Sequence, residues 1–151
     1  MNDCYICKKH NGSIESCGEI YKDDLLAIYH LEPGSGEVYL GYLFIELRRH
    51  IEGLGDMNDV EATAIGKMMQ RISKLLREHY AVEHVYAHVI GDHVPHLHIH
   101  IIPRYQGAPR EYWGIKTDEW PDAPHGGKDR ILVFCNEMKH FLMKEQENGQ
   151  I

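Results

Sequence analysis

Three histidines alternate with apolar residues in the run His96-Leu97-His98-Ile99-His100-Ile101-Ile102, which ends at Pro103. Successive side chains of a strand point to opposite faces, so this spacing predicts three imidazoles on one face and an apolar row on the other. Imidazoles beside a core need a metal, an anion or a hydrogen-bonding partner. A half-buried strand with polar outer positions is the simpler alternative, but it would equally accept Thr or Lys. The pattern therefore favours a chemical site.

Two cysteines near the start of the chain form a second candidate site. Cys4 and Cys7 are separated by two residues, a spacing with which two thiolates hold one zinc ion. A structural zinc site would need two further ligands from elsewhere in the chain. A redox pair and an empty knuckle are the alternatives, although a redox pair usually follows a strand and opens a helix.

Several strands are expected to position these residues. Two short strands around an Asp-Asp turn are predicted within 19–32, and a central strand within 38–47 precedes His50. A further strand within 82–90 should form an antiparallel hairpin with the histidine strand. Its histidines, His84 and His88, are interpreted as solvated or hydrogen-bonded polar positions.

The clearest helix is predicted over about 59–79, where apolar residues recur at helical spacing after a capping box of Asn58 and Glu61. An aromatic loop and a second amphipathic helix are expected within 104–147, the helix beginning at Lys128. The loop should be ordered, covering either the site or a partner subunit. The polar tail from Lys144 onward is expected to fray.

Length and composition restrict the class of protein. A chain of 151 residues suggests one domain over 1–151, with an N-terminal zinc knuckle over 1–18. Four cysteines without an apolar leader indicate a cytoplasmic protein with reduced thiols, and no apolar run is long enough for a membrane span. A net charge of −7 argues against broad binding of nucleic acid or anionic membranes.

The histidine run, together with the CxxC, the sequence Arg49-His50-Ile51-Glu52 and the sequence Pro103-Arg104-Tyr105, resembles the histidine triad (HIT) family of nucleotide hydrolases and transferases. The resemblance covers most of the chain. It implies an α+β fold in which helices cover an antiparallel sheet of about five strands, with one long central helix and a C-terminal helix. It also implies a homodimer.

The resemblance implies a role for each of two histidines. His98, the middle one, would attack the α-phosphorus of a nucleotide and form a nucleotidyl-histidine intermediate. A neutral imidazole suits this role, because it is both a good nucleophile and a good leaving group near pH 7. His100 would hydrogen-bond a phosphate oxygen or the leaving group, or act as a general acid when protonated.

Zinc-containing members of the family resemble this chain more closely. Carried over residue by residue, their zinc ligands are Cys4, Cys7, His50 and His96. A closed set of four ligands would make the zinc structural rather than catalytic. A zinc ion bound by all three triad histidines, with metal-activated water as the nucleophile, is the alternative, but it leaves the CxxC unexplained.

The chain departs from the family pattern next to the triad. Asp92 and His93 stand where many members have Gln or Asn and then Ser or Thr, so these two residues are the candidates for phosphate contact. Asp92 would repel a polyphosphate unless it faces away or is protonated, whereas His93 could act as a donor. The usual ribose-binding acid is matched only approximately, by His30 or Glu32.

Three functions are compatible with these features. The first is hydrolysis or transfer at the α-phosphate of (di)nucleoside polyphosphates or nucleoside phosphoramidates. The second is a zinc-stabilised, nucleotide-binding regulatory protein with weak catalysis. The third is a redox or metal-storage protein that uses Cys4 and Cys7.

Overall fold

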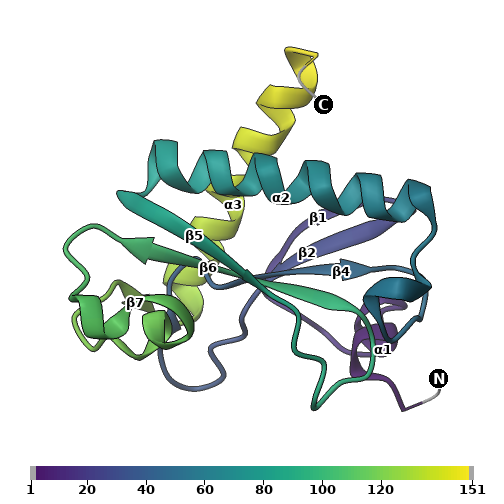
Figure 1. The fold of residues 1–151 in the computed structure, drawn as a ribbon, viewed down its shortest axis with the longest axis horizontal. Coiled ribbons are helices and arrows are strands. Elements are labelled where there is room, and N and C mark those ends of the chain that lie inside the picture. Colours follow the sequence, from purple (N-terminus) through teal and green to yellow (C-terminus); the bar gives the residue numbers. More distant parts are fainter. Residues whose placement is uncertain (1–2, 150–151) are drawn as a thin grey trace.

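The computed structural model of the protein describes residues 3–149 (Figure 1). Its helices are α1 (Tyr5–His10), α2 (Asp59–His79) and α3 (Lys128–Glu147), with the short 3₁₀ helices η1 (Leu54–Asp56), η2 (Arg110–Tyr112) and η3 (Gly114–Glu119). Its strands are β1 (Glu19–Lys22), β2 (Leu26–His30), β3 (Val38–Tyr39), β4 (Leu43–Leu47), β5 (Val82–His88), β6 (His98–Tyr105) and β7 (His125–Gly126). Within 3–149, no helix combines the length and apolar character that a membrane span requires.

Five strands form one sheet in the order β1-β2-β4-β6-β5, and every neighbouring pair is antiparallel. β3 and β7 form a separate pair. The predicted α+β fold, with about five antiparallel strands, a long central helix and a C-terminal helix, is therefore confirmed. β6 lies between β4 and β5, so the histidine strand is internal to the sheet and is held on both sides.

One face of the sheet packs in the core, and the other face carries the histidines. Alternate side chains of β4 and β6, including Ile45 and Ile99, are buried in the core together with Ile72 of α2. α2 extends across this face of the sheet (Figure 1). The register pairs Glu46 with His98, and the alternation of a strand turns both side chains to the opposite face. The core thus supports a rigid platform for the histidines.

The capping box predicted for α2 is present. The Asn58 side chain accepts a hydrogen bond from the Glu61 N–H, and the Glu61 carboxylate accepts one from the Asn58 N–H. The same carboxylate accepts two hydrogen bonds from Arg49, at 2.8 Å each, which lower the pKa of Glu61 to about 2. The start of α2 therefore anchors the segment that carries His50.

The prediction of a single strand over 38–47 is wrong for the first half of this range. The chain forms β3, turns at Gly41, where φ is +81°, and resumes as β4. The Gly41 N–H donates to Nε2 of His30, and a Cβ at this position would lie 2.9 Å from Cγ of Pro103. Close approach to two other strands, rather than strand pairing, thus determines the backbone here.

Two other boundaries differ from the sequence prediction. β6 begins at His98, two residues later than expected, and continues through Pro103 to Tyr105. α3 extends to Glu147 instead of fraying from Lys144, because Glu145 is still buried. The last part of the predicted tail, 150–151, lies outside the described residues.

The aromatic loop packs near the far end of β6. The ring of Trp113 contacts two guanidinium groups, with Arg104 at 3.7 Å and Arg110 at 4.8 Å from the ring centroid. Its Nε1 donates to the carbonyl oxygen of Ala108 at 3.0 Å. The loop then returns as β7 to pair with β3. No loop residue lines the cavity beside His98 that is described below.

Candidate functional site

A cluster of two thiols and two imidazoles joins α1 to the sheet. Cys4 is the N-cap of α1 and Cys7 lies one turn later, so both thiols face the same side. His50 comes from the segment after β4, and His96 lies just before β6. Their ligand atoms all lie within 4.8 Å of one another, so the four residues predicted as metal ligands are brought together.

The geometry of this cluster fits a tetrahedral metal ion. Nδ1 of His96 lies 3.4 Å from Sγ of Cys4 and 3.5 Å from Sγ of Cys7, and Nδ1 of His50 lies 3.4 Å from Sγ of Cys7. Zn–S and Zn–N bonds at a tetrahedral angle would separate such atoms by about 3.5 Å. Nε2 of His96 donates to the carbonyl oxygen of Leu47 at 2.6 Å, which leaves the Nδ1 lone pair directed at the thiols.

The structure fixes the tautomer of His98. Its Nδ1 lies 2.6 Å from the carbonyl oxygen of His96. A carbonyl oxygen only accepts hydrogen bonds, so in the neutral form of the ring Nδ1 carries the proton and Nε2 carries the lone pair. His98 is half-buried and lines a cavity, which makes Nε2 the candidate nucleophilic atom.

His100 lies on the same face of β6, with its ring centroid 4.9 Å from that of His98. The hydroxyl of Tyr42 lies 2.8 Å from Nδ1 of His100. Burial, together with the imidazoles of His98 and His88, lowers the pKa of His100 to about 4. His100 is therefore neutral at pH 7.

The residues upstream of the triad lie on an exposed connection. Asp92 and His93 are exposed on the connection between β5 and β6. Within the described part of the chain, neither forms a hydrogen bond or ion pair. Their assignment to phosphate contact thus stays a prediction.

The surroundings of His88 differ from the sequence prediction of a solvated or hydrogen-bonded side chain. It is the cross-strand partner of His100. Its Nε2 is buried and has no hydrogen-bonding partner within 3–149. The sequence did not indicate that His88 lies beside His100, because this pairing depends on the register between β5 and β6.

A cavity of about 190 Å³ opens beside His98. Its apolar walls come from several elements, with α1 contributing two of the residues: Tyr5, Ile6, Leu31, Phe44 and Val94. Lys9, Glu32 and Glu46 add charged groups to the lining. The cavity is therefore mainly apolar next to the nucleophile and polar where these charges lie.

A buried ionic network adjoins this cavity. Nζ of Lys9 lies 2.5 Å from Oε1 of Glu46, and Nε2 of His10 lies 2.8 Å from Oε2 of the same carboxylate. All three side chains are more than nine-tenths buried. The Lys9 ammonium also lies 4.0 Å from the ring centroid of Tyr29. No sequence pattern indicated this network, because α1 and β4 are far apart along the chain.

Of the two residues that approximately match a ribose-binding acid, His30 already has both ring nitrogens in hydrogen bonds within the protein. Its Nδ1 donates to the carbonyl oxygen of Leu31, and its Nε2 accepts from the Gly41 N–H, each at 2.8 Å. Burial lowers its pKa to about 4. Glu32 accepts hydrogen bonds from Ser16 and Cys17 and still lines the cavity.

Comparison with known proteins identifies the class to which this fold and site belong. The sequence model of the HIT domain matches residues 14–107. An uncharacterised HIT-like protein of Methanocaldococcus jannaschii is 30% identical over 109 residues, which cover 69% of this chain and 81% of that protein. The chain therefore belongs to the HIT family. Cys4 and Cys7 precede the matched region, whereas His50 and His96 lie within it.

Solved structures of HIT-family proteins have the same fold. A zinc-bound histidine triad family protein of Mycobacterium smegmatis has a TM-score of 0.71 at 17% identity, over 97% of this chain and 98% of that chain. A hypothetical histidine triad nucleotide-binding protein of Sulfolobus tokodaii has a TM-score of 0.72 at 18% identity, over 95% and 94%. Family membership supports a function in nucleotide binding or hydrolysis.

Proposed function

We propose that the protein is a nucleotide hydrolase or nucleotidyl transferase that acts at the α-phosphate. Its substrates would be (di)nucleoside polyphosphates or nucleoside phosphoramidates. The observation that carries the proposal is the hydrogen bond from Nδ1 of His98 to the carbonyl oxygen of His96, at 2.6 Å. It leaves the Nε2 lone pair of a neutral imidazole available beside a cavity, as a nucleophile requires.

The reaction would proceed in two displacements at phosphorus. Nε2 of His98 forms a P–N bond while the P–O or P–N bond to the leaving group breaks and its electron pair departs with that group, which takes up a proton from solvent when it leaves as an amine. Water or another acceptor then attacks the nucleotidyl-histidine and loses a proton, and the electron pair of the P–N bond returns to Nε2. A neutral imidazole is restored, ready for the next cycle.

His100 would act as a hydrogen-bond donor rather than as a general acid. A pKa of about 4 leaves it neutral at pH 7. If the Tyr42 hydroxyl donates to Nδ1 over their 2.8 Å contact, Nε2 of His100 carries the proton. That N–H would stabilise the negative oxygens of the transition state. Asp92 and His93 would contact the phosphates or the leaving group from the preceding loop.

A structural zinc ion would be held by Cys4, Cys7, His50 and His96. The zinc-bound relative and the spacing of the ligand atoms support this assignment. Four protein ligands leave no open position, so the ion would stabilise the fold and would not activate water. It would fix α1, which contributes Tyr5, Ile6 and Lys9 to the cavity wall.

The protein would be a cytoplasmic homodimer. β5 is an edge strand of the sheet, so one of its sides remains available for another chain. All four cysteines are unpaired, as expected in a reducing compartment.

The alternative is a nucleotide-binding, zinc-stabilised regulatory protein with weak catalysis. The exposure of Asp92 and His93, which form no hydrogen bond or ion pair within the described chain, favours this alternative. It predicts nucleotide binding without a covalent intermediate.

Steady-state kinetics of His98→Ala test the proposal. Turnover of adenosine and guanosine phosphoramidates and of dinucleoside polyphosphates by His98→Ala would be compared with turnover by wild-type protein and by His84→Ala, a control at an exposed residue of β5. We expect His98→Ala to lose turnover by at least about a thousandfold, while unfolding temperature and zinc content are retained. Parental rates in His98→Ala, with His84→Ala equally active, would refute it.

A further inference from the structure

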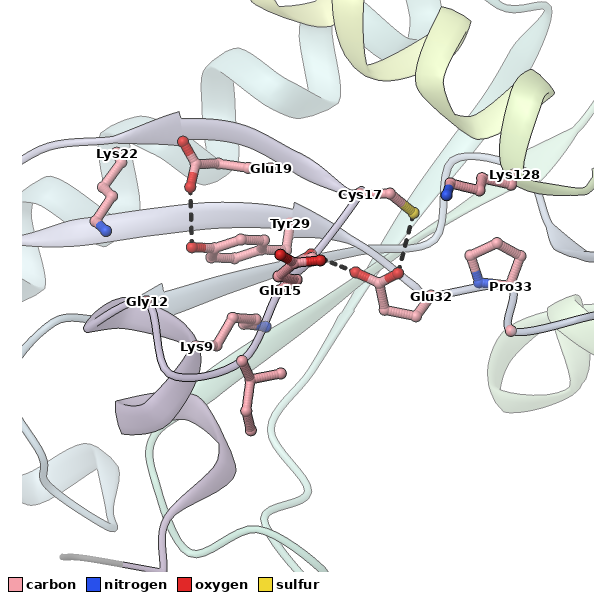
Figure 2. Close-up of a pocket in the computed structure, with 13 residues that line it drawn as sticks. Lys9, Gly12, Glu15, Cys17, Glu19, Lys22, Tyr29, Glu32, Pro33 and Lys128 are labelled. Carbon is pink, nitrogen blue, oxygen red and sulfur yellow. Dashed lines mark hydrogen bonds between the residues drawn. The ribbon is translucent and has the colours of Figure 1, made fainter.

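The cavity beside His98 is too small for a whole nucleotide. Its volume is about 190 Å³, whereas sites for drug-sized ligands measure roughly 300–1,000 Å³. A second cavity of about 620 Å³ shares Lys9 and Glu32 with it as walls (Figure 2). The two cavities therefore share a wall at these residues, and a ligand held at His98 would pass over them to reach the larger cavity.

The apolar character of the smaller cavity determines which end of the substrate lies there. Tyr5, Ile6 and Phe44 suit the uncharged nucleoside part of the substrate better than a polyphosphate, which would also meet the carboxylates of Glu32 and Glu46. The leaving group would then depart toward the exposed loop that carries Asp92. The sugar is bonded to the reacting phosphate, so the base would extend past Lys9 into the larger cavity.

The larger cavity is lined by both signs of charge. Three carboxylates and three ammonium groups take part: Glu15, Glu19, Glu32, Lys9, Lys22 and Lys128. Some are already engaged, since Glu19 accepts from the Tyr29 hydroxyl at 3.2 Å and Lys22 donates to the His10 carbonyl oxygen at 2.8 Å. Figure 2 shows the bonds to Glu19 and Glu32 as dashed lines.

Two of these groups remain available to a ligand. Neither Glu15 nor Lys128 forms a hydrogen bond or ion pair with any other residue of 3–149. Lys9 adds a third group, because its ammonium has three N–H donors and its only hydrogen-bond acceptor within the described chain is Glu46. A base in this cavity would therefore meet the unpaired carboxylate of Glu15, the Lys9 ammonium held by Glu46, and the exposed ammonium of Lys128.

Building on the proposed function, we propose that this cavity reads the base and selects guanine over adenine. The carboxylate of Glu15 would accept from N1–H and the 2-amino group of guanine, while Lys9 or Lys128 would donate to O6 or N7. Adenine has an acceptor at N1, which a carboxylate repels, and it lacks the 2-amino donor. Hypoxanthine lacks only the 2-amino group and should rank between them.

The test measures kcat/KM for guanosine, inosine and adenosine 5′-phosphoramidates with the same leaving group. We expect guanosine to exceed adenosine by about tenfold or more. Glu15→Gln should reduce this ratio to about threefold or less; Glu15 is exposed, so the change should not disturb folding. Glu78→Gln, which is exposed on α2 away from this cavity, is the matched control and should keep the wild-type ratio.

Equilibrium binding separates failure of this proposal from failure of catalysis. If no nucleotide is turned over, calorimetry with GMP and AMP still measures base preference, and tighter binding of GMP that is lost in Glu15→Gln supports the proposal. Equal kcat/KM values or equal affinities for the two bases would overturn it. An unchanged preference in Glu15→Gln, or no binding of either nucleotide, would also overturn it.

Discussion

The carbonyl oxygen of His96 accepts the Nδ1–H of His98 at 2.6 Å, while the imidazole of His96 faces the Cys4 and Cys7 thiols. One residue therefore offers its side chain to the proposed metal and its backbone to the proposed nucleophile. The proposed metal cluster and the proposed catalytic histidine are thus linked through a single peptide segment. Disturbing either group should be detectable at the other.

Removing one thiol should affect both metal content and substrate affinity. Cys7→Ser is expected to lower zinc from about one ion per chain to well below that value, because a closed site needs all four ligands. α1 has only six residues and would lose its anchor, so we also expect a lower unfolding temperature and a KM that rises more than kcat falls. Elemental analysis and thermal unfolding measure these changes.

Cys17→Ser is the matched control for zinc content, since Cys17 is not in the metal cluster. A Cys7→Ser protein with full zinc and wild-type stability would rule out the assigned ligands. More than one tightly bound metal per chain would instead favour the metal-storage function.

Replacing one partner of the buried Lys9–Glu46 pair should lower the free energy of unfolding more than replacing both charged groups does. Lys9→Met would leave the Glu46 carboxylate buried without its ammonium, at a cost of about 3 kcal/mol in the free energy of unfolding. Adding Glu46→Gln removes that charge and should recover much of the loss. Urea unfolding of the single and double variants, both saturated with zinc, measures the difference. A double variant less stable than Lys9→Met would contradict this account.

The sequence predicts those parts of the site that depend on residues close together along the chain. The spacing of Cys4 and Cys7 and the alternation about His98 are local patterns, and the structure brings the four predicted metal ligands together. The Lys9–Glu46 contact joins residues 37 positions apart. No local pattern indicates such a pair, because its existence depends on how α1 docks on β4.

The same reasoning applies to the fold. The long helix α2 was predictable from its apolar period and from its capping box at Asn58, both of which are local. The break between β3 and β4 was not, because Gly41 is required by the approach of Pro103 and by the bond to His30. Residue composition alone therefore predicts one continuous strand across such a turn.

The pKa of His100 predicts a pH dependence of stability. Its folded-state pKa of about 4 lies below the ordinary value of 6.5, so as pH falls below 6.5 the unfolded chain binds a proton that the folded chain does not. The free energy of unfolding should therefore decrease as pH falls from 6.5 toward 4. His100→Asn removes this contribution and should lose less stability than wild type between pH 7.0 and 5.5.

Chemical denaturation at a series of pH values measures this difference. His84→Asn, at an exposed residue of β5, is the control and should follow the wild-type curve. Identical curves for wild type and His100→Asn would mean that His100 is not kept neutral by its surroundings.

The central claim, that Nε2 of His98 forms a covalent bond to the α-phosphorus, is tested most directly by trapping the intermediate. Wild-type protein would be mixed with a nucleoside phosphoramidate, quenched within milliseconds under conditions that preserve P–N bonds, and analysed by intact-mass and peptide mass spectrometry. We predict one nucleotidyl group per active chain, located on His98 and absent from His98→Ala. Turnover without any such adduct, or an adduct on another residue, would contradict the proposed mechanism.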